Sequence, residues 1–285
     1  MNIKKYWIML AIALVSLSTI SCGGDDDTTD EFPVNNQVNT AIKTVFPKAR
    51  LDSISSYTDY GNIKIKYNGD YLTEYGEYYD NGKVHDGVHY RLKWNKNEVE
   101  FYLGKLETPF MKVILGSNGF AKECLNTDGS VRHTFEYDEE GHLVKYNSKD
   151  AASHATPDYV VCQWENGNMV KDTWYFYKTN GSYRDGYCEY NFTYSSIANT
   201  VALMPALRGY DWFEGPEPEY LTAMHYAGLL GKGTKNLVSA SSNRWDNGQS
   251  NQKYAYQYKM SNGFVISCSD GYKYDYFFYT NISNN

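Results

Sequence analysis

The chain has 285 residues, with 34 acidic against 27 basic side chains and a formal net charge of −7. This balance excludes nucleic-acid binding as the main role, because a phosphate backbone needs a basic surface on its partner. The length is ample for one large β domain, or two smaller ones, with a sizeable core. The 29 Tyr, 12 Phe and 6 Trp favour strands over helices.

Residues 1–21 form a predicted lipoprotein signal peptide. Two lysines precede the apolar run Tyr6 to Ile20, which is too short to span a bilayer comfortably. The run ends at Thr19-Ile20-Ser21-Cys22, which resembles a lipobox, the motif whose cysteine is lipidated and becomes the new N-terminus. We therefore expect a lipid anchor at Cys22. A plain signal peptide with a spare cysteine is the alternative.

Residues 22–33 are predicted to be a disordered acidic tether. This polar, low-complexity stretch cannot bury enough apolar surface to fold. Its acidic residues also resemble the surface-export signal of Bacteroidetes lipoproteins. We therefore expect a chain held at the outer membrane and exposed at the cell surface, with a periplasm-facing position as the alternative. Calcium binding by Asp25, Asp26 and Asp27 is disfavoured, because no turn glycine and distal Glu follow at loop spacing.

Residues 34–105 combine one predicted helix with strands. Residues 35–46 place four apolar side chains on one helical face, and Pro47 ends the helix. This helix and the strand pair in Ala49 to Tyr67 resemble periplasmic PepSY-like modules. The resemblance implies a helix packed on a sheet and an inhibitory or envelope-sensing role as one functional alternative.

Residues 106–285 are predicted to form an antiparallel meander built on a repeated hairpin. Ser117 to Tyr137 and Ser261 to Tyr279 both begin with Ser-Asn-Gly-Phe, place a cysteine five residues after that glycine, and turn again at an Asp-Gly pair. Asn-Gly and Asp-Gly pairs accept the positive φ angles of type I′ turns. A looser third copy spans Asn166 to Tyr194. The turn spacing is even in all three copies, which keeps the same strand face inward.

The sequence therefore predicts a mainly β fold, an antiparallel meander forming a curved sheet or barrel-like structure with a few short helices. Two helices are expected to interrupt the meander. Ser195 or Ser196 can cap the first, which continues through Val201. The second begins at Pro218 and closes at Gly231.

The meander is similar to a family of Bacteroidetes lipoproteins of unknown function with a porin-like fold. The resemblance covers about residues 106–282 and is carried by Phe135 to Leu143, Phe192 to Ile197, Tyr226 to Leu237 and the final hairpin. The Tyr-Asp-x-x-Gly-x-Leu element also resembles the YD repeats of Rhs-type proteins. The family resemblance implies a curved or barrel-like sheet and supplies no catalytic residue. Neighbouring charges such as Lys122-Glu123 and Lys171-Asp172 place charge on both strand faces, which disfavours a lipid-facing outer surface.

Cysteine and histidine spacings predict no metal site and no cofactor. The cysteines after the lipobox are Cys124, Cys162, Cys188 and Cys268. They include no CxxC pair, so we expect buried free thiols, with disulfides as the alternative. His85 and His89 are separated by strand spacing, which keeps them far apart, and His225 is expected to be a hydrogen-bonded core histidine.

Candidate ligand-binding residues combine aromatic and acidic side chains: Trp212, Glu214, Tyr272 and Tyr274. Exposed Tyr and Trp offer contact area at low entropy cost, although cross-strand ladders that stabilise the sheet are the alternative. Asp211 to Glu219 also places carboxylates beside aromatic rings. A glycosidase needs two carboxylates flanking a cleft, so Glu214, Glu217 or Glu219 could act in a hydrolase. An acidic loop leading into a helix is the favoured alternative.

We expect an envelope lipoprotein whose sheet is a non-catalytic binding or structural module for a glycan or an envelope protein. The anchor, the tether and the aromatic strands favour this interpretation, and no catalytic constellation opposes it. A glycan-acting hydrolase and a PepSY-like inhibitor or sensor are the alternatives.

Overall fold

The computed structural model describes residues 36–46, 48–56, 62–79, 81–148, 159–176, 186–203, 219–248, 253–270 and 274–281, the last range by its backbone and the Phe277 side chain. The chain divides into two units, Met1–Glu31 and Phe32–Asn285, and every described residue belongs to the second. Among the described helices, none has the length and apolar character needed to cross a membrane.

Seventeen strands and two helices make up the described part of the chain. The helices are α1 (Asn36–Val45) and α2 (Tyr220–Tyr226). The strands are β1 (Ala49–Ser56), β2 (Asn62–Asn68), β3 (Tyr71–Tyr78), β4 (Val84–Trp94), β5 (Glu98–Leu103), β6 (Met111–Leu115), β7 (Ala121–Asn126), β8 (Val131–Tyr137), β9 (Leu143–Ser148), β10 (Tyr159–Glu165), β11 (Asn168–Phe176), β12 (Gly186–Ala198), β13 (Asn236–Trp245), β14 (Lys253–Ala255), β15 (Gln257–Ser261), β16 (Phe264–Ser269) and β17 (Tyr274–Asn281).

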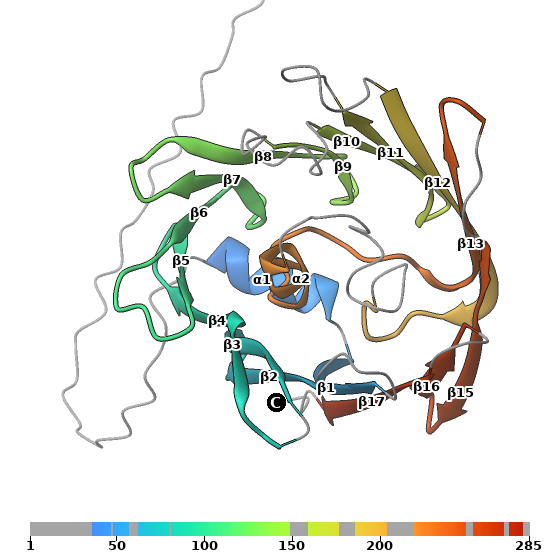
Figure 1. Cartoon of the computed structure of the whole chain (residues 1–285), viewed down its shortest axis with the longest axis horizontal. Coiled ribbons are helices and arrows are strands. Elements are labelled where there is room, and N and C mark those ends of the chain that lie inside the picture. The colour runs from blue at the N-terminus through green and yellow to red at the C-terminus, as the bar shows by residue number, and fades with distance from the viewer. Residues whose placement is uncertain are drawn as a thin grey trace, which may run out of the picture. The chain divides into compact units, whose positions relative to one another are not determined.

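The strands form one antiparallel meander that closes on itself. Each strand from β1 to β14 pairs with the next along the chain, and β15, β16 and β17 continue the series. Only Tyr256 separates β14, which pairs with β13, from β15, which pairs with β16. The last strand pairs with the first, from Ala49 opposite Asn281 to Ser56 opposite Asp275. The ring in Figure 1 is therefore barrel-like, and the predicted fold class is confirmed.

The repeated hairpins form as the sequence predicts. The two matching copies become β6–β7–β8 and β15–β16–β17. Gly119 and Gly263, which occupy the same position in these copies, both have a φ of 82°. Cys124 in β7 and Cys268 in β16 are both buried. The repeat thus places the same side chains on the inner face of the ring twice.

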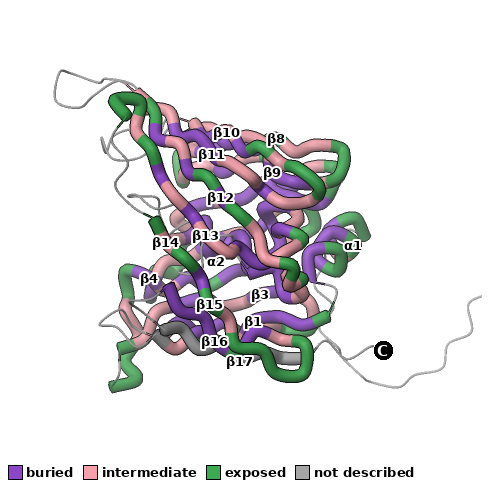
Figure 2. The backbone as a smooth tube through the Cα atoms, turned by 90° about the vertical axis from the view of Figure 1, so that its right-hand side faces the viewer, coloured by how far each residue is buried: buried purple, intermediate pink, exposed green. Residues whose placement is uncertain are grey.

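Helix α1 lies across one end of the ring (Figures 1 and 2), which we call the α1 end. Its apolar face is buried through Val38, Ala41, Ile42 and Val45, while the opposite face is solvent-exposed. The amphipathic pattern that predicted this helix therefore also marks which face covers the end of the ring.

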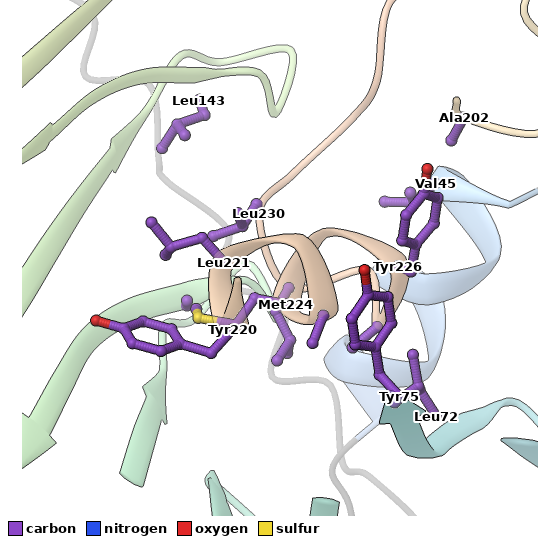
Figure 3. Packing of buried hydrophobic residues seen from close by; sticks show 14 of the residues in the cluster. Val45, Leu72, Tyr75, Leu143, Ala202, Tyr220, Leu221, Met224, Tyr226 and Leu230 are labelled. Carbon is purple, nitrogen blue, oxygen red and sulfur yellow. The ribbon is translucent and has the colours of Figure 1, made fainter. Parts of the chain in front are cut away.

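Helix α2 lies inside the ring, where all seven of its residues are buried. Tyr226 stacks on Tyr75 of β3 at 6.5 Å between ring centroids, and Sγ of Cys124 lies 3.9 Å from Sδ of Met224. Figure 3 shows this packing around the helix. Because side chains of α2 pack against β3 and β7, the interior of the ring around this helix is a packed core.

Two helix predictions need correction. Ser195 and Ser196, expected to cap a helix, lie in β12, because this strand continues to pair with β13 as far as Ala198 opposite Asn236. Helix α2 was predicted to close at Gly231 but ends at Tyr226. The reason is that Gly228, with a φ of 75°, already reverses the chain and donates its N–H to the His225 carbonyl oxygen at 2.8 Å.

Candidate functional site

Most of the predicted ligand-binding residues lie outside the described part of the chain. Trp212, Glu214 and Tyr272 fall there, as does Cys22, the predicted lipid-attachment residue. Tyr274 is the first residue of β17 and its backbone pairs with Ser269, but its side chain is not among those described. The sites below are therefore built from other residues, except that Glu219, one of the hydrolase candidates, is described.

A groove of about 450 Å³ opens at the α1 end, between α1 and the turns that join β6 to β7 and β8 to β9. Most of its lining residues have polar side chains, although more of the surface that they expose is apolar; they are Asn36, Gln37, Thr40, Ala41, Thr44, Ser117, Asn118, Phe120, Asp138, Glu139, Glu140, Gly141 and Lys232. We call it the α1 groove. Pockets of this volume are a usual size for small-molecule sites.

Glycines let the walls of the α1 groove approach closely. A Cβ on Gly119 would lie 2.6 Å from the carbonyl oxygen of Gln37, so only glycine lets the β6–β7 turn meet α1 here. On the other wall, the backbone N–H of Lys232 donates to the carbonyl oxygen of Gly141 at 2.9 Å, and a Cβ on Gly231 would lie 2.5 Å from that same oxygen. These backbone contacts position the two turns that form the groove.

The β8–β9 turn supplies the negative charge of the α1 groove. The backbone N–H of His142 donates to Oδ1 of Asp138 at 2.8 Å, and Nδ1 of His142 lies 3.1 Å from Oδ2. Although partial burial raises the pKa of Asp138, these hydrogen bonds lower it below its ordinary value. The imidazole of His142 stacks on Trp164 at 4.3 Å between ring centroids. Asp138 is therefore a fixed anion, held by a histidine that is itself packed in place.

A second polar cluster surrounds the residue that precedes α2. We call Glu77, His85, Tyr90 and Glu219 the α2 cluster. Burial, and then the nearby charge of Glu77, raises the pKa of Glu219 above its ordinary value. The Tyr90 hydroxyl donates a hydrogen bond to the Glu219 carboxylate, and burial together with this carboxylate raises the pKa of Tyr90. The cluster thus joins a carboxyl group whose pKa is raised to a second acidic side chain, Glu77.

Aromatic rings and an arginine border the α2 cluster. The guanidinium of Arg132 lies 5.8 Å from the ring centroid of Phe110 and 5.7 Å from that of Tyr220. Tyr90 packs against the same two rings, at 5.9 Å and 6.4 Å between centroids. The sequence predicted aromatic rings beside carboxylates near Trp212. The structure shows this combination on other residues of the α2 cluster and its border.

The described histidines and acidic residues do not form a metal site, since no group of three or more His, Cys, Asp or Glu side chains converges among them. His89 lies 3.1 Å from the carboxylate of Glu74, while His85 packs against Tyr79 at 5.4 Å between ring centroids. His225 is buried and its Nε2 donates to the Ala202 carbonyl oxygen at 2.7 Å, which confirms the predicted core histidine.

The four described cysteines are free and buried, as expected. Burial raises the pKa of the Cys124 and Cys162 thiols well above their ordinary value. Because the thiolate is the nucleophile, these groups are chemically inert in the fold.

Sequence reasoning missed the α1 groove because its residues come from four distant segments. The Asn118-Gly119 and Asp138-to-Gly141 stretches were recognised only as hairpin turns. The signal that could have found them is the neighbouring pair Glu139-Glu140 on a turn whose partners are polar, together with the polar face of the first helix. The packing of α1 across the end of the ring brings these segments together.

Comparisons with known proteins agree on the fold. A family model described as a domain of unknown function with porin-like fold (DUF4595) matches residues 46–267. A porin-like protein from Bacteroides uniformis is similar over 84% of this chain and 97% of its own, with 18% identity and a TM-score of 0.52. A second, from Bacteroides vulgatus, is similar over 81% of this chain and 99% of its own, with 11% identity and a TM-score of 0.51.

The search of curated proteins gives no match. The solved structures share the fold, and the family model spans most of the chain, from the end of α1 to β16. The chain therefore belongs to the family of domains of unknown function with a porin-like fold.

Proposed function

We propose that this chain is a cell-envelope lipoprotein, anchored at the outer membrane through Cys22, whose barrel-like domain is a non-catalytic binding module. The observation that carries the proposal is the α1 groove, an open pocket of about 450 Å³ at one end of a closed sheet, lined mostly by residues with polar side chains. Its ligand is a glycan or a polar segment of another envelope protein, since amide, hydroxyl and carboxylate groups line it.

The packed interior supports binding over transport. Helix α2 is buried within the ring, and the backbone N–H of Ala121 in β7 donates to the carbonyl oxygen of Leu229, just after that helix, at 2.8 Å. Opening a channel would break these contacts and expose apolar surface, which costs roughly 25 cal/mol per Å².

The outer face of the strands supports a position outside the lipid bilayer. Lys112 lies 3.0 Å from Glu98 and 3.3 Å from Glu100, whose neighbours Val99 and Phe101 point inward and are fully buried. Similar ion pairs recur on other strands: Lys66 with Glu74, Lys145 with Glu136 and Lys171 with Glu189. A lipid-facing barrel needs an apolar outer band instead, so a lipid anchor is the consistent mode of attachment.

The binding role is tested by affinity electrophoresis of Glu31 to Asn285 through gels that contain a panel of host and plant polysaccharides. We expect one glycan to retard the protein, and Thr40→Phe, which fills the groove from the exposed face of α1, to remove the retardation. Leu106→Phe is the control, because Leu106 is 50% exposed and lies in the loop between β5 and β6. Uniform migration, followed by no capture of an envelope protein by the wild type, would refute the binding role.

Anchoring is tested separately in cells. We expect Cys22→Ser to release the protein from the membrane fraction, and a protease added to intact cells to degrade the wild type if it is surface-exposed. Retention of the serine variant in the membrane fraction would argue against the lipid anchor.

A glycan hydrolase is the second candidate, and the α2 cluster favours it. Glu219 holds its proton more tightly than an ordinary carboxyl group, as a general acid must, and Glu77 supplies a second carboxylate. Incubation with the retarding glycan should then release reducing ends, and Glu219→Gln should lower the rate at least 100-fold. An unchanged glycan would leave the α2 cluster with a structural role.

A further inference from the structure

We propose that the α1 groove selects ligands that carry amines beside hydroxyl groups, such as glucosamine-type sugars, over neutral or acidic glycans. This inference rests on the binding function proposed above and names the ligand class of the same groove. It follows from the charge, the hydrogen-bonding character and the spread of the groove's side chains.

The first step is charge. Asp138, Glu139 and Glu140 line the groove, against the single ammonium group of Lys232. Hydrogen bonds from His142 keep Asp138 ionised, and the Glu140 side chain is 74% exposed and ready to meet a ligand. The excess of negative charge attracts a cationic ligand and repels uronic acids and other anions.

The second step is hydrogen bonding. On the α1 wall, the hydroxyls of Thr40 and Thr44 donate to the carbonyl oxygens one helical turn earlier, at 2.9 and 2.8 Å. Their oxygen lone pairs are left to accept hydrogen bonds, as are the carboxylates across the groove. A surface rich in acceptors suits a ligand rich in donors, which both ammonium and hydroxyl groups supply.

The third step is the spacing of the oxygen atoms, which favours an extended ligand over a bare metal ion. A cation such as Ca²⁺ needs six to eight oxygens converging at about 2.4 Å. The described acidic side chains include no group of three that could hold a metal. The carboxylates instead follow the β8–β9 turn along one wall of a cavity of about 450 Å³. This arrangement suits several donors spread over a sugar-sized molecule.

The fourth step is pre-organisation. Gly119 and Gly141 both have positive φ, and each lies where a Cβ would press on the opposite wall or on Phe120. The β6–β7 turn therefore packs closely on α1, and the hydrogen bond from the Lys232 N–H to the Gly141 carbonyl oxygen ties the β8–β9 turn to the segment after α2, so the backbone of the groove is ordered before binding.

The test is calorimetric titration of the mature chain with three oligosaccharides of equal length at mildly acidic pH: a glucosamine oligomer, its N-acetylated form and a galacturonate oligomer. We expect the glucosamine oligomer to bind roughly three- to tenfold more tightly than the N-acetylated form, the galacturonate not to bind, and the preference to shrink as salt is added. The double variant Glu139→Gln, Glu140→Gln should lose the preference while retaining the weaker binding. Glu107→Gln, an exposed carboxylate in the β5–β6 loop, is the matched control and should keep it.

Each outcome separates the two proposals. Equal affinity for the glucosamine and N-acetylated oligomers, abolished by Thr40→Phe, would overturn the amine selectivity and leave the binding function intact. Binding of an oligolysine peptide in place of the sugars would overturn the hydroxylated class of ligand. Absence of binding by all the probes would overturn the inference, and the polysaccharide and envelope-protein screens then decide the binding function independently.

Discussion

Titratable side chains on the outer and inner faces of the same strands differ in exposure and in charge state. On the outer face, Lys112 sits between two carboxylates and remains 40% exposed. On the inner face, His133 is fully buried and Asp172 is 1% exposed, and burial pushes both toward their neutral forms. Exposed pairs contribute little to stability, whereas buried neutral groups make it depend on pH. The outer face therefore maintains solubility, and the inner face decides whether the barrel stays folded.

Disrupting the contact between the β6–β7 turn and α1 should have the largest effect on the stability of the barrel. In Gly119→Ala, the new Cβ would lie 2.6 Å from the Gln37 carbonyl oxygen and 2.9 Å from Cβ of Ala41, at a φ of 82°. We expect a loss of roughly 4 kcal/mol in unfolding free energy, measured by denaturant titration, from backbone strain plus overpacking. Gly263→Ala is the matched control, because it has the same φ in the equivalent turn and nothing within 4 Å of its Cβ. Equal losses in the two variants would show that α1 can shift freely.

Acid should weaken the inner face through His133. Burial, and then the charge of Arg132, lowers the pKa of this histidine from 6.5 to about 3. The unfolded chain therefore takes up the proton first, so the stabilising term is complete above pH 6.5 and is lost as pH falls toward 3. In His133→Gln, which can still hydrogen-bond the Tyr220 hydroxyl, we expect a shallower decline, with a difference on the order of 3 kcal/mol at the acid end. Parallel stability curves for the two proteins would contradict a buried neutral imidazole.

Asp172 should show the opposite dependence on pH. Burial raises the pKa of this carboxyl group well above its ordinary value, more than the indole of Trp174 lowers it. Because the folded state keeps a proton that the unfolded chain releases, this contribution to stability is complete below the unfolded pKa and is lost as pH rises toward the folded value. We expect Asp172→Asn to raise the unfolding free energy by roughly 2–4 kcal/mol at neutral pH and to flatten the decline in stability that begins as pH rises above the unfolded pKa. Asp128→Asn, in an exposed turn, should leave that decline unchanged.

The strands and turns of the sheet could be predicted from the sequence, whereas the packing of the ring interior could not. Asn-Gly and Asp-Gly pairs locate the turns because their backbone chemistry is local, and the alternation of apolar and polar residues in β12 matches the burial of Cys188, Tyr190 and Phe192. Ser195 and Ser196 misled because capping residues suit a helix, while pairing with a strand some 40 residues away overrides that local preference. Long-range pairing of this kind leaves no mark in a short window of sequence.

The candidate site was less predictable than the sheet. The sequence places Lys171 and Asp172 on opposite faces of a strand, but only the packed interior shows that the Asp172 carboxyl group is fully enclosed. The walls of the α1 groove are similar: Thr40 and Glu140 are each unremarkable in sequence, and they become neighbours of one cavity because α1 crosses the end of a closed ring. Their chemistry depends on closure, which is a property of the whole chain.

The smallest effect is expected on the outer face, where neighbouring residues allow a direct comparison. Lys112 points outward in β6 and contacts Glu98 and Glu100, while the next residue, Val113, points inward and is fully buried. Lys112→Met should change the unfolding free energy by less than about 1 kcal/mol, and the change should diminish as salt screens the pair. Val113→Ala should cost about 2 kcal/mol at any salt concentration, since it leaves a cavity. Denaturant titrations at low and high salt measure both. If the lysine variant loses as much as the alanine variant, the outer ion pairs act as a connected network and the two faces share the work of holding the barrel closed.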